Sequence, residues 1–443
     1  MNSNKGLTYV QPFINSAIFL ACLFEKSFTE LSISMKYQSY FITISLILLT
    51  MLFFTKCINS SQENVGNHSA NFSDFAGSAT CLNCHKDIYN SHIETAHFHT
   101  SELATEKSIK GSFDSSKNQF VYNNGNMVAM EKRANGLYQV VYVNGEEKKS
   151  QRFDMVVGSG AKGQSFVSWV GNNLVQMPIT YFTSAAQWSN SPGYPNRIAM
   201  NRPISSRCME CHATYAELVS APGKEPEQFD KVKMIMGVDC EKCHGPAAKH
   251  VEFQTAHPTE KLAKFILNPA RFTRQQSLDL CALCHGGKLQ KKSPSFSFTA
   301  GDKLTDYFTS DSTNQLTDNI DVHGNQYGLL KASKCFQKSA NLTCVTCHNS
   351  HENEQGKNTQ FSQRCIGCHN QEHADALICK MTAKIGPAIK DNCIDCHMPE
   401  KPSMAISVLL QGDKLATPAK MHTHLIMPYP DETKKVLEFL KKK

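Results

Sequence analysis

The pattern Cys-x-x-Cys followed at once by His occurs seven times in this chain of 443 residues. Two residues between the thiols let one turn of chain bring both sulfurs to the two vinyl groups of one porphyrin, with the adjacent His under the ring face. This is the attachment pattern of c-type haem. Numbered in chain order, motifs 1 to 7 are Cys81–His85, Cys208–His212, Cys240–His244, Cys281–His285, Cys344–His348, Cys365–His369 and Cys393–His397.

The motifs therefore predict seven covalently bound haem c groups, each with its iron held by the motif His. The predicted attachment residues are Cys81, Cys84, Cys208, Cys211, Cys240, Cys243, Cys281, Cys284, Cys344, Cys347, Cys365, Cys368, Cys393 and Cys396. The predicted iron ligands in the motifs are His85, His212, His244, His285, His348, His369 and His397.

Structural zinc is the main alternative, because zinc sites also use paired Cys-x-x-Cys. Zinc does not require a His directly after the second Cys. His makes up 18 of 443 residues, so seven such His residues do not arise by chance. The pattern favours haem over zinc at all seven places.

The composition fits a protein packed around cofactors. Its apolar fraction of 41% is slightly low for this length, and seven macrocycles would supply the missing core. We expect a mainly α and irregular, haem-packed multihaem cytochrome c. The formal charge of +7 would be offset by the haem propionates, so it does not indicate nucleic-acid binding.

Covalent haem attachment takes place outside the cytoplasmic membrane, so an export signal is expected near the N-terminus. Met35 and Lys36 precede an apolar run at residues 41–54, which is short for a spanning helix and suits a signal peptide. Cys57 follows and predicts a lipid anchor, although Lys56 replaces the usual small residue and an ordinary cleaved signal is the alternative. We expect an exported periplasmic or outer-membrane lipoprotein, with residues 1–57 a mis-started N-terminus plus signal and 58–74 a tether.

The long gap between motifs 1 and 2 carries a different kind of sequence. Short β-branched and aromatic runs are separated by turns such as Asn144-Gly145, which predicts a small antiparallel β insertion over residues 112–199. The Gly-rich segment at 158–163 is interpreted as a turn, not a phosphate site. Residues 75–111 form the first haem segment, 200–430 a six-haem domain and 431–443 a Lys-rich helix. Further helices are predicted over 88–105 and 365–383.

The residue on the second face of each iron decides the chemistry. A second His closes the iron and keeps its potential low, a Met raises the potential, and an open face permits catalysis. Eleven His residues lie outside the motifs, enough to close all seven irons. His97 or His99, with His92 a further candidate, follows motif 1, and His422 or His424 follows motif 7. The predicted second ligands are His97, His250, His323, His351, His373 and His424.

Three other residues receive a structural interpretation. Met398 lies too close to His397 to reach the opposite face of the same iron, so we expect it to pack. Cys335 and Cys379 lie outside the motifs. In an oxidising compartment a disulfide between them is predicted, with a pair of buried thiols as the alternative.

The chain resembles the superfamily of multihaem c-type cytochromes that includes the tetrahaem cytochromes of nitrifiers and hydroxylamine oxidoreductase. The resemblance rests on residues 79–85 with His97, on 237–246 with His250, on 268–271, on 342–351 and on 393–399. It implies that His97, His250 and His351 are second iron ligands. The chain lacks the Cys-x-x-Cys-Lys motif of related nitrite reductases and an eighth motif, and neither Tyr307 nor Tyr327 carries a mark of the oxidoreductase's haem cross-link.

These observations leave two functions open. The first is an electron carrier with a chain of mostly bis-His haems, serving redox protein partners and held to a membrane by a lipid. The second is an oxidoreductase that acts on a small nitrogen or sulfur compound at one five-coordinate haem. The number of irons with a second protein ligand distinguishes them.

Overall fold

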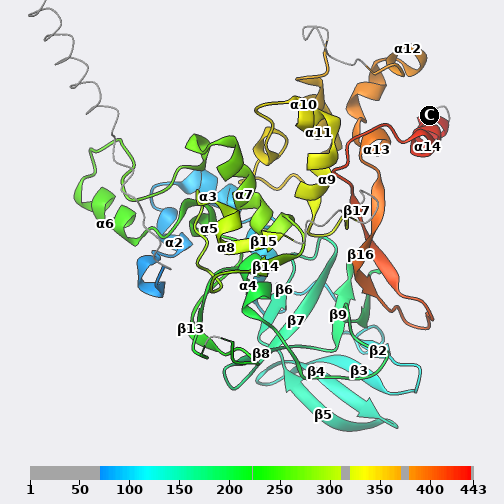
Figure 1. Ribbon diagram of the computed structural model, residues 1–443. Helices are drawn as coiled ribbons and strands as arrows, with labels where there is room; N and C mark the ends of the chain where they lie inside the picture. The colour runs from blue at the N-terminus through cyan, green and yellow to red at the C-terminus, as the bar shows by residue number, and fades with distance from the viewer. Residues whose placement is uncertain (1–69, 222, 311–319, 371–378, 441–443) are drawn as a thin grey trace, which may run out of the picture. The chain divides into compact units, whose positions relative to one another are not determined.

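The computed structural model describes residues 70–221, 223–310, 320–370 and 379–440, which are drawn in colour in Figure 1. The predicted signal peptide, Cys57, the tether up to residue 69 and His373 lie outside these residues. Among the described residues, none of the helices combines the length and the apolar character that crossing a membrane requires.

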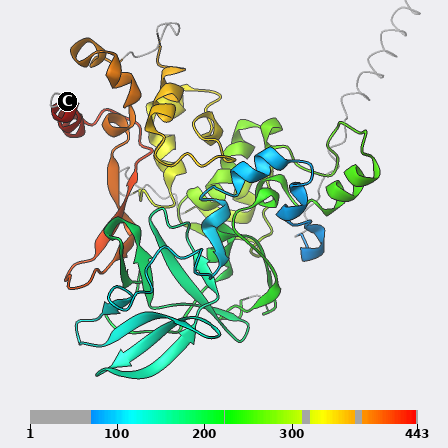
Figure 2. The same cartoon turned by 180° about the vertical axis from the view of Figure 1, so that it is seen from behind.

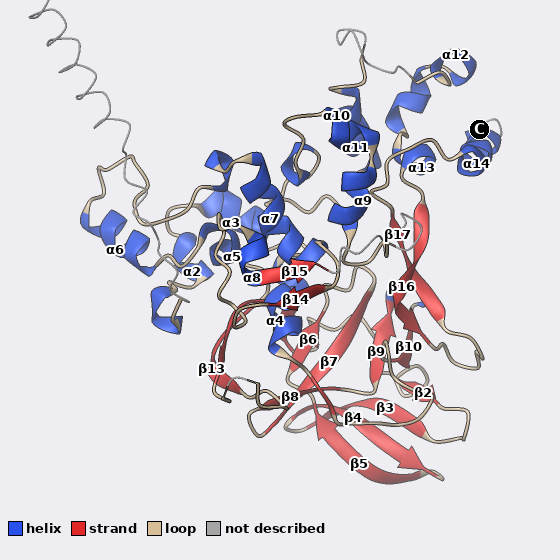
Figure 3. Ribbon diagram, in the orientation of Figure 1, coloured by secondary structure: helices blue, strands red, loops and turns tan. Residues whose placement is uncertain are grey.

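A four-stranded antiparallel sheet occupies the gap between motifs 1 and 2 (Figure 3). Its strands follow one another as hairpins, with Asn144 and Gly145 forming the last turn at φ values of 52° and 81°. Such left-handed pairs suit the twist of a two-residue hairpin. The strands are β2 (Gln119–Val121), β3 (Met127–Arg133), β4 (Gly136–Val143) and β5 (Glu146–Arg152).

A seven-stranded antiparallel sheet packs with it. The strand order is β1-β6-β7-β8-β11, and β9 pairs with both β7 and β10. The strands are β1 (Ser101–Leu103), β6 (Met155–Val157), β7 (Gly163–Val170), β8 (Asn173–Gln176), β9 (Ile179–Phe182), β10 (Gln187–Asn190) and β11 (Arg202–Pro203). We call residues 101–203 the β unit; it extends beyond the predicted limits of 112 and 199 at both ends.

The β unit has a side-chain core of its own. Trp188 lies at its centre against Phe166 and Tyr181, and its indole N–H donates to the Ser112 carbonyl at 3.0 Å. Gly111 lies directly under the indole, where a Cβ would overlap the ring. Fully buried Phe120 and Met130 complete the centre. This core needs no cofactor to fill it.

The motifs lie on short helices outside the β unit. The α-helices are α2 (Ser78–Cys81), α3 (Lys86–His92), α4 (Ser206–His212), α5 (Cys240–His244), α6 (Ala248–Ala256), α7 (Arg274–His285), α8 (Leu304–Tyr307), α9 (Gln326–Ala332), α10 (Lys334–Lys338), α11 (Asn358–Ile366), α12 (Thr382–Ile385), α13 (Ile394–His397) and α14 (Pro430–Leu440). The 3-10 helices are η1 (Phe72–Asp74), η2 (Phe98–Thr100), η3 (Thr183–Ala185), η4 (Pro269–Arg271), η6 (Cys344–Thr346) and η7 (Pro387–Asp391).

The prediction of a mainly α and irregular fold is wrong. About 30% of the structure is helical and 25% is strand, because strands are not confined to the β unit. Three hairpins lie among the motifs: β12 (Ala213–Leu218) with β13 (Phe229–Met236), β14 (Leu289–Lys291) with β15 (Phe308–Ser310), and β16 (Glu400–Val408) with β17 (Thr417–His422). Segments that connect motifs must still satisfy their backbone N–H and C=O groups, and they do so by pairing.

Two predicted helices are shorter or differently placed. The helix expected over 88–105 is α3, which ends at His92, and β1 follows at Ser101. The Thr95 hydroxyl donates to the His92 carbonyl and accepts from Phe98 N–H, so the side chain stabilises a turn in place of a continuing helix. The helix expected over 365–383 begins earlier and is α11, which ends at Ile366.

The hairpin that follows motif 7 docks on the β unit, as the two views in Figures 1 and 2 show. Asn190 at the end of β10 accepts from Leu409 N–H at 2.5 Å, and its own backbone N–H donates to the Leu409 carbonyl at 3.3 Å. Phe182, Val408 and Ala419 form a small buried cluster beside it. This contact connects the last haem segment to the β unit.

Replacing Asn190 by Ala should weaken this connection. The change leaves Leu409 N–H buried without its acceptor, which is expected to lower the free energy of unfolding by about 1–3 kcal/mol. Chemical denaturation of the two proteins measures the difference. Asn172→Ala is the control, because that side chain is exposed and no loss is expected there. Equal effects of the two changes would contradict the role given to Asn190.

Candidate functional site

Each motif places its three chemical groups by a single turn of backbone. The N–H of the motif His donates to the carbonyl of the first motif Cys at 2.8 Å in motif 1, 2.9 Å in motifs 5 and 6, and 3.1 Å in motif 7. This i to i+4 bond closes one helical turn. Both thiols and the imidazole therefore lie together on one side of a short helical segment, as attachment to one porphyrin requires.

Thiols from different motifs meet in pairs. Each pair lies close enough for the two thiols to shift each other's pKa: Cys81 with Cys240, Cys211 with Cys284, Cys281 with Cys344, and Cys365 with Cys393. Backbone contacts agree for motifs 2 and 4: the Cys211 sulfur lies 3.9 Å from the Leu283 carbonyl and the Cys284 sulfur 3.9 Å from the Glu210 carbonyl. The structure thus brings motifs 1 and 3, 2 and 4, 4 and 5, and 6 and 7 into contact.

Three motif imidazoles face an imidazole from elsewhere in the chain. The ring centres of His285 and His97 are 6.4 Å apart, those of His244 and His351 6.1 Å, and those of His348 and His424 5.9 Å. A metal–imidazole bond is about 2 Å long and the ring centre lies about 1 Å behind the nitrogen, so two imidazoles on one iron have centres about 6 Å apart. The spacing of these pairs fits an iron between them.

Burial favours the neutral, metal-binding form of several of the imidazoles in the described site. It lowers the pKa of His285 and of His424 to about 4. The pKa values of His97, His212, His348 and His351 are also lowered, with burial as the main cause. A neutral imidazole offers a lone pair to iron, whereas a protonated ring offers none.

Several rings are oriented through their Nδ1 atoms. Nδ1 contacts a backbone carbonyl in His212 (Thr100, 3.2 Å), His244 (Leu267, 2.9 Å), His250 (Lys264, 2.8 Å) and His422 (Met398, 2.6 Å). Metal-ligating His residues commonly donate one ring N–H in this way, which leaves the other nitrogen for the metal. The arrangement therefore suits His250 and His422 as iron ligands. His422 is the candidate that the sequence had set beside His424.

The structure separates the candidates near motif 1. Both ring nitrogens of His92 contact carbonyls, Nδ1 that of Ser350 at 3.3 Å and Nε2 that of Val238 at 3.1 Å, so neither is free for iron. The Nδ1 of His99 pairs with Glu102 at 3.4 Å. Only His97 of the three faces a motif His.

His424 and His323 are placed differently. The ring of His424 faces that of His348, and its Nδ1 atom is buried without a hydrogen-bond partner. His323 lies near enough to His212 and His285 to lower the pKa of each, yet its own ring is exposed. His373 lies outside the described residues. The structure thus brings three of the six predicted second ligands opposite motif His residues: His97, His351 and His424.

The two described cysteines outside the motifs do not pair with each other. Cys335 and Cys379 are both free thiols, so the expected disulfide is not formed. Cys335 is instead half-buried beside Cys347 and Cys368, and its burial raises its thiol pKa. In the described part of the chain, no three His, Cys, Asp or Glu side chains are grouped to hold a bare metal ion.

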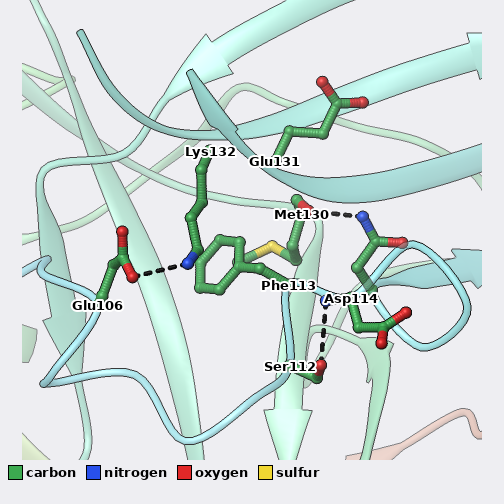
Figure 4. Close-up of a pocket in the computed structure, with 8 residues that line it drawn as sticks. Glu106, Ser112, Phe113, Asp114, Met130, Glu131 and Lys132 are labelled. Atoms are coloured by element: carbon green, nitrogen blue, oxygen red, sulfur yellow. Dashed lines mark hydrogen bonds and ion pairs between the residues drawn. The ribbon is translucent and has the colours of Figure 1, made fainter. Parts of the chain in front are cut away.

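The β unit contains an open cavity of about 660 Å³, shown in Figure 4. Its polar groups satisfy one another: Lys132 pairs with Glu106 at 2.6 Å, and the Asn118 amide donates to the Met130 carbonyl at 2.8 Å. No motif residue lines it; the lining residues are Glu106, Ser112, Phe113, Asp114, Asn118, Met130, Glu131 and Lys132. This cavity carries no arrangement of catalytic groups.

Two comparisons with known proteins agree with this site. The family described as cytochrome c554 and c-prime matches residues 184–245, which include motifs 2 and 3. Among solved structures, the outer cell wall cytochrome OcwA is similar with a TM-score of 0.51 at 17% identity, over 82% of this chain and 81% of that one. Together these two matches support a multihaem c-type cytochrome. No curated protein matches the sequence.

The same comparisons support the prediction of covalently bound haem c. The structure also shows which motifs lie next to each other, and this could not be predicted from the sequence. It also reveals buried carboxylates beside the motifs, which the sequence analysis missed. The one feature of the sequence that could have indicated them is position, because Glu210 and Glu241 lie inside motifs 2 and 3.

Proposed function

We propose that this cytochrome carries electrons along seven haem c groups, most of them bis-His, between redox protein partners in the cell envelope. Bound haem c supplies one-electron chemistry at its iron. The observation that carries the proposal is the proximity of the motifs, because the thiols that would hold neighbouring haems lie close together in four pairs. Electron transfer falls off steeply with distance, so such contacts favour a conduit.

Further contacts connect motif 3 with motif 4, motif 5 with motif 6, and motif 6 with motif 7. The thiols of motifs 3 and 4 lie close enough for Cys243 to raise the pKa of Cys281. Arg364, next to motif 6, donates to the Cys347 carbonyl of motif 5 at 2.6 Å. Cys393 N–H of motif 7 donates to Ser362 on α11 at 3.0 Å. We infer the order 1-3-4-5-6-7, with motif 2 beside motif 4.

The facing imidazoles support closed irons. His97, His351 and His424 would hold the irons of motifs 4, 3 and 5 from the second side, and the carbonyl contact of His250 suits the same role elsewhere. We further propose His323 and His373 as second ligands. Bis-His ligation fills the coordination sphere and leaves no place for substrate.

Membership of the nitrifier tetrahaem and hydroxylamine oxidoreductase superfamily is part of this proposal, supported by the family match at residues 184–245. So are export by the apolar run at 41–54 and a lipid anchor at Cys57. A neighbour in the fold from an outer cell wall supports a place in the envelope. These features would set the cytochrome between partners on a membrane surface.

The reduced protein with added carbon monoxide tests the proposal. Mass spectrometry and haem assay should give seven haems per chain, and the low-spin visible spectrum should be almost unchanged by carbon monoxide. Iron closed by two imidazoles offers no site for the ligand. Fewer than seven haems would contradict the attachment sites. A strong response of one haem in the native protein would favour the oxidoreductase instead.

A further inference from the structure

Every buried acidic side chain in the described residues lies at a haem motif. Five Asp or Glu residues are buried there, and no Lys or Arg is. Glu210 lies inside motif 2, Glu241 inside motif 3, and Asp239, Asp279 and Glu354 lie within a few residues of motifs 3, 4 and 5. The β unit, with the larger side-chain core, buries none among its described residues.

This placement needs a physical reason, because a buried charge is costly unless another charge or hydrogen bonds compensate it. Two of the five have an arginine. Glu210 pairs with Arg207 at 3.3 Å, and Glu354 pairs with Arg364 at 2.5 Å. In motifs 2 and 5 the negative charge is therefore already offset by the protein itself.

The other three have no cation among the described residues. Glu241 is 4% exposed and accepts backbone N–H groups from Ala76 (2.8 Å), Gly77 (2.9 Å) and Ala247 (2.8 Å). Neighbouring Lys242 points elsewhere, with its Nζ over the Phe296 ring. The Glu241 charge is held by dipoles alone.

Asp239 and Asp279 are held in the same way. Asp239, 5% exposed, accepts from Cys240 N–H at 2.7 Å. Asp279, also 5% exposed, accepts from the Gln275 amide at 2.7 Å and from Leu304 N–H at 3.1 Å. Asp239 and Glu241 both act on the Cys81 thiol and oppose its ionisation, so they face the place where motifs 1 and 3 meet.

We propose that Asp239, Glu241 and Asp279 are positioning charges that lower the reduction potentials of the haems on motifs 3 and 4. This inference rests on the proposed function. A fixed negative charge in a low-dielectric interior stabilises the extra positive charge of ferric iron, and reduction by one electron removes that positive charge. In the order 1-3-4-5-6-7, electrons then cross the two haems of lowered potential directly after motif 1.

A spectroelectrochemical titration of the haem-loaded protein tests this inference at fixed pH. Glu241→Gln and Asp279→Asn should each move the part of the curve contributed by one haem to higher potential, and the double variant should move two parts. Arg364→Gln should act in the opposite direction, because it leaves Glu354 uncompensated near motif 5. Asp395→Asn is the matched control, since that carboxylate lies inside motif 7 but is only partly buried, and no shift is expected.

The outcomes separate this inference from the proposed function. Haem content and low-spin spectra test whether the motifs carry closed haems. With both intact, an unchanged curve for Asp279→Asn, or a shift to lower potential, would overturn the role of these carboxylates. Glu241→Gln also removes an acceptor for Gly77 N–H and can disturb folding. If the Glu241 variant loses haem, the Asp279→Asn variant alone decides the test.

Discussion

Replacing His351 by Ala is expected to turn one low-spin haem into a high-spin haem that binds carbon monoxide. The His351 ring faces that of His244 at 6.1 Å, and no other described imidazole faces His244 from that side at a comparable distance. Removing it opens one iron, which then takes an exogenous ligand. Difference spectra of the reduced variant with and without carbon monoxide should show the response of a single haem, absent from the parent protein.

His92 provides a control from the same place in the structure. Its ring centre lies 6.2 Å from that of His351, but both of its nitrogens contact backbone carbonyls. His92→Ala should therefore leave every haem low-spin, although it can lower stability through the lost contacts. Carbon monoxide binding in the His92 variant, or none in the His351 variant, would show that the second ligand of motif 3 is assigned wrongly.

The second large effect is expected when the chain is made without haem attachment. Of the twelve largest fully buried side chains, nine belong to the β unit, and only Met209 and Leu278 lie on helices that carry motifs. The β unit can bury its own apolar surface, whereas the motif segments depend on the macrocycles for theirs. The haem-free chain should keep a folded β unit while residues of motifs 2 to 7 lose their structure.

Hydrogen exchange resolved along the sequence measures this directly. In the haem-free chain, amides of β3, β4 and β7 should exchange slowly, as in the haem-loaded protein. Amides of α4, α7 and α11 should exchange at rates near those of an unfolded chain, a loss of protection of several orders of magnitude. Comparable protection of α7 with and without haem would refute the idea that the cofactors form this core.

The sequence indicated more about the chemistry of this chain than about its fold. One turn of chain fixes both thiols and the imidazole of a motif, so spacing alone was enough to predict the sites. The turn at Asn144-Gly145 was equally local. The hairpins β12–β13 and β16–β17 were not predicted. Their strands pair through backbone groups, and the need of those groups for partners leaves no pattern in the residue types.

The choice of second ligands also depended on distant contacts. His97 and His99 are two residues apart, and only the folded chain shows that His97 faces His285 while His99 pairs with Glu102. His92 was a further candidate, and both of its ring nitrogens contact carbonyls. Spacing along the chain cannot report which nitrogen is left free.

Two of the facing imidazoles lie later in the chain than the motifs that they face. This order would matter while the protein matures. His351 follows motif 5 yet faces motif 3, and His424, near the C-terminus, faces motif 5. A chain that crosses a membrane with its N-terminus first presents motif 3 to the attachment machinery long before residue 351 has emerged. If the proposed export and ligand pairing hold, the maturing protein would pass through a stage of open irons, which its last segment would close.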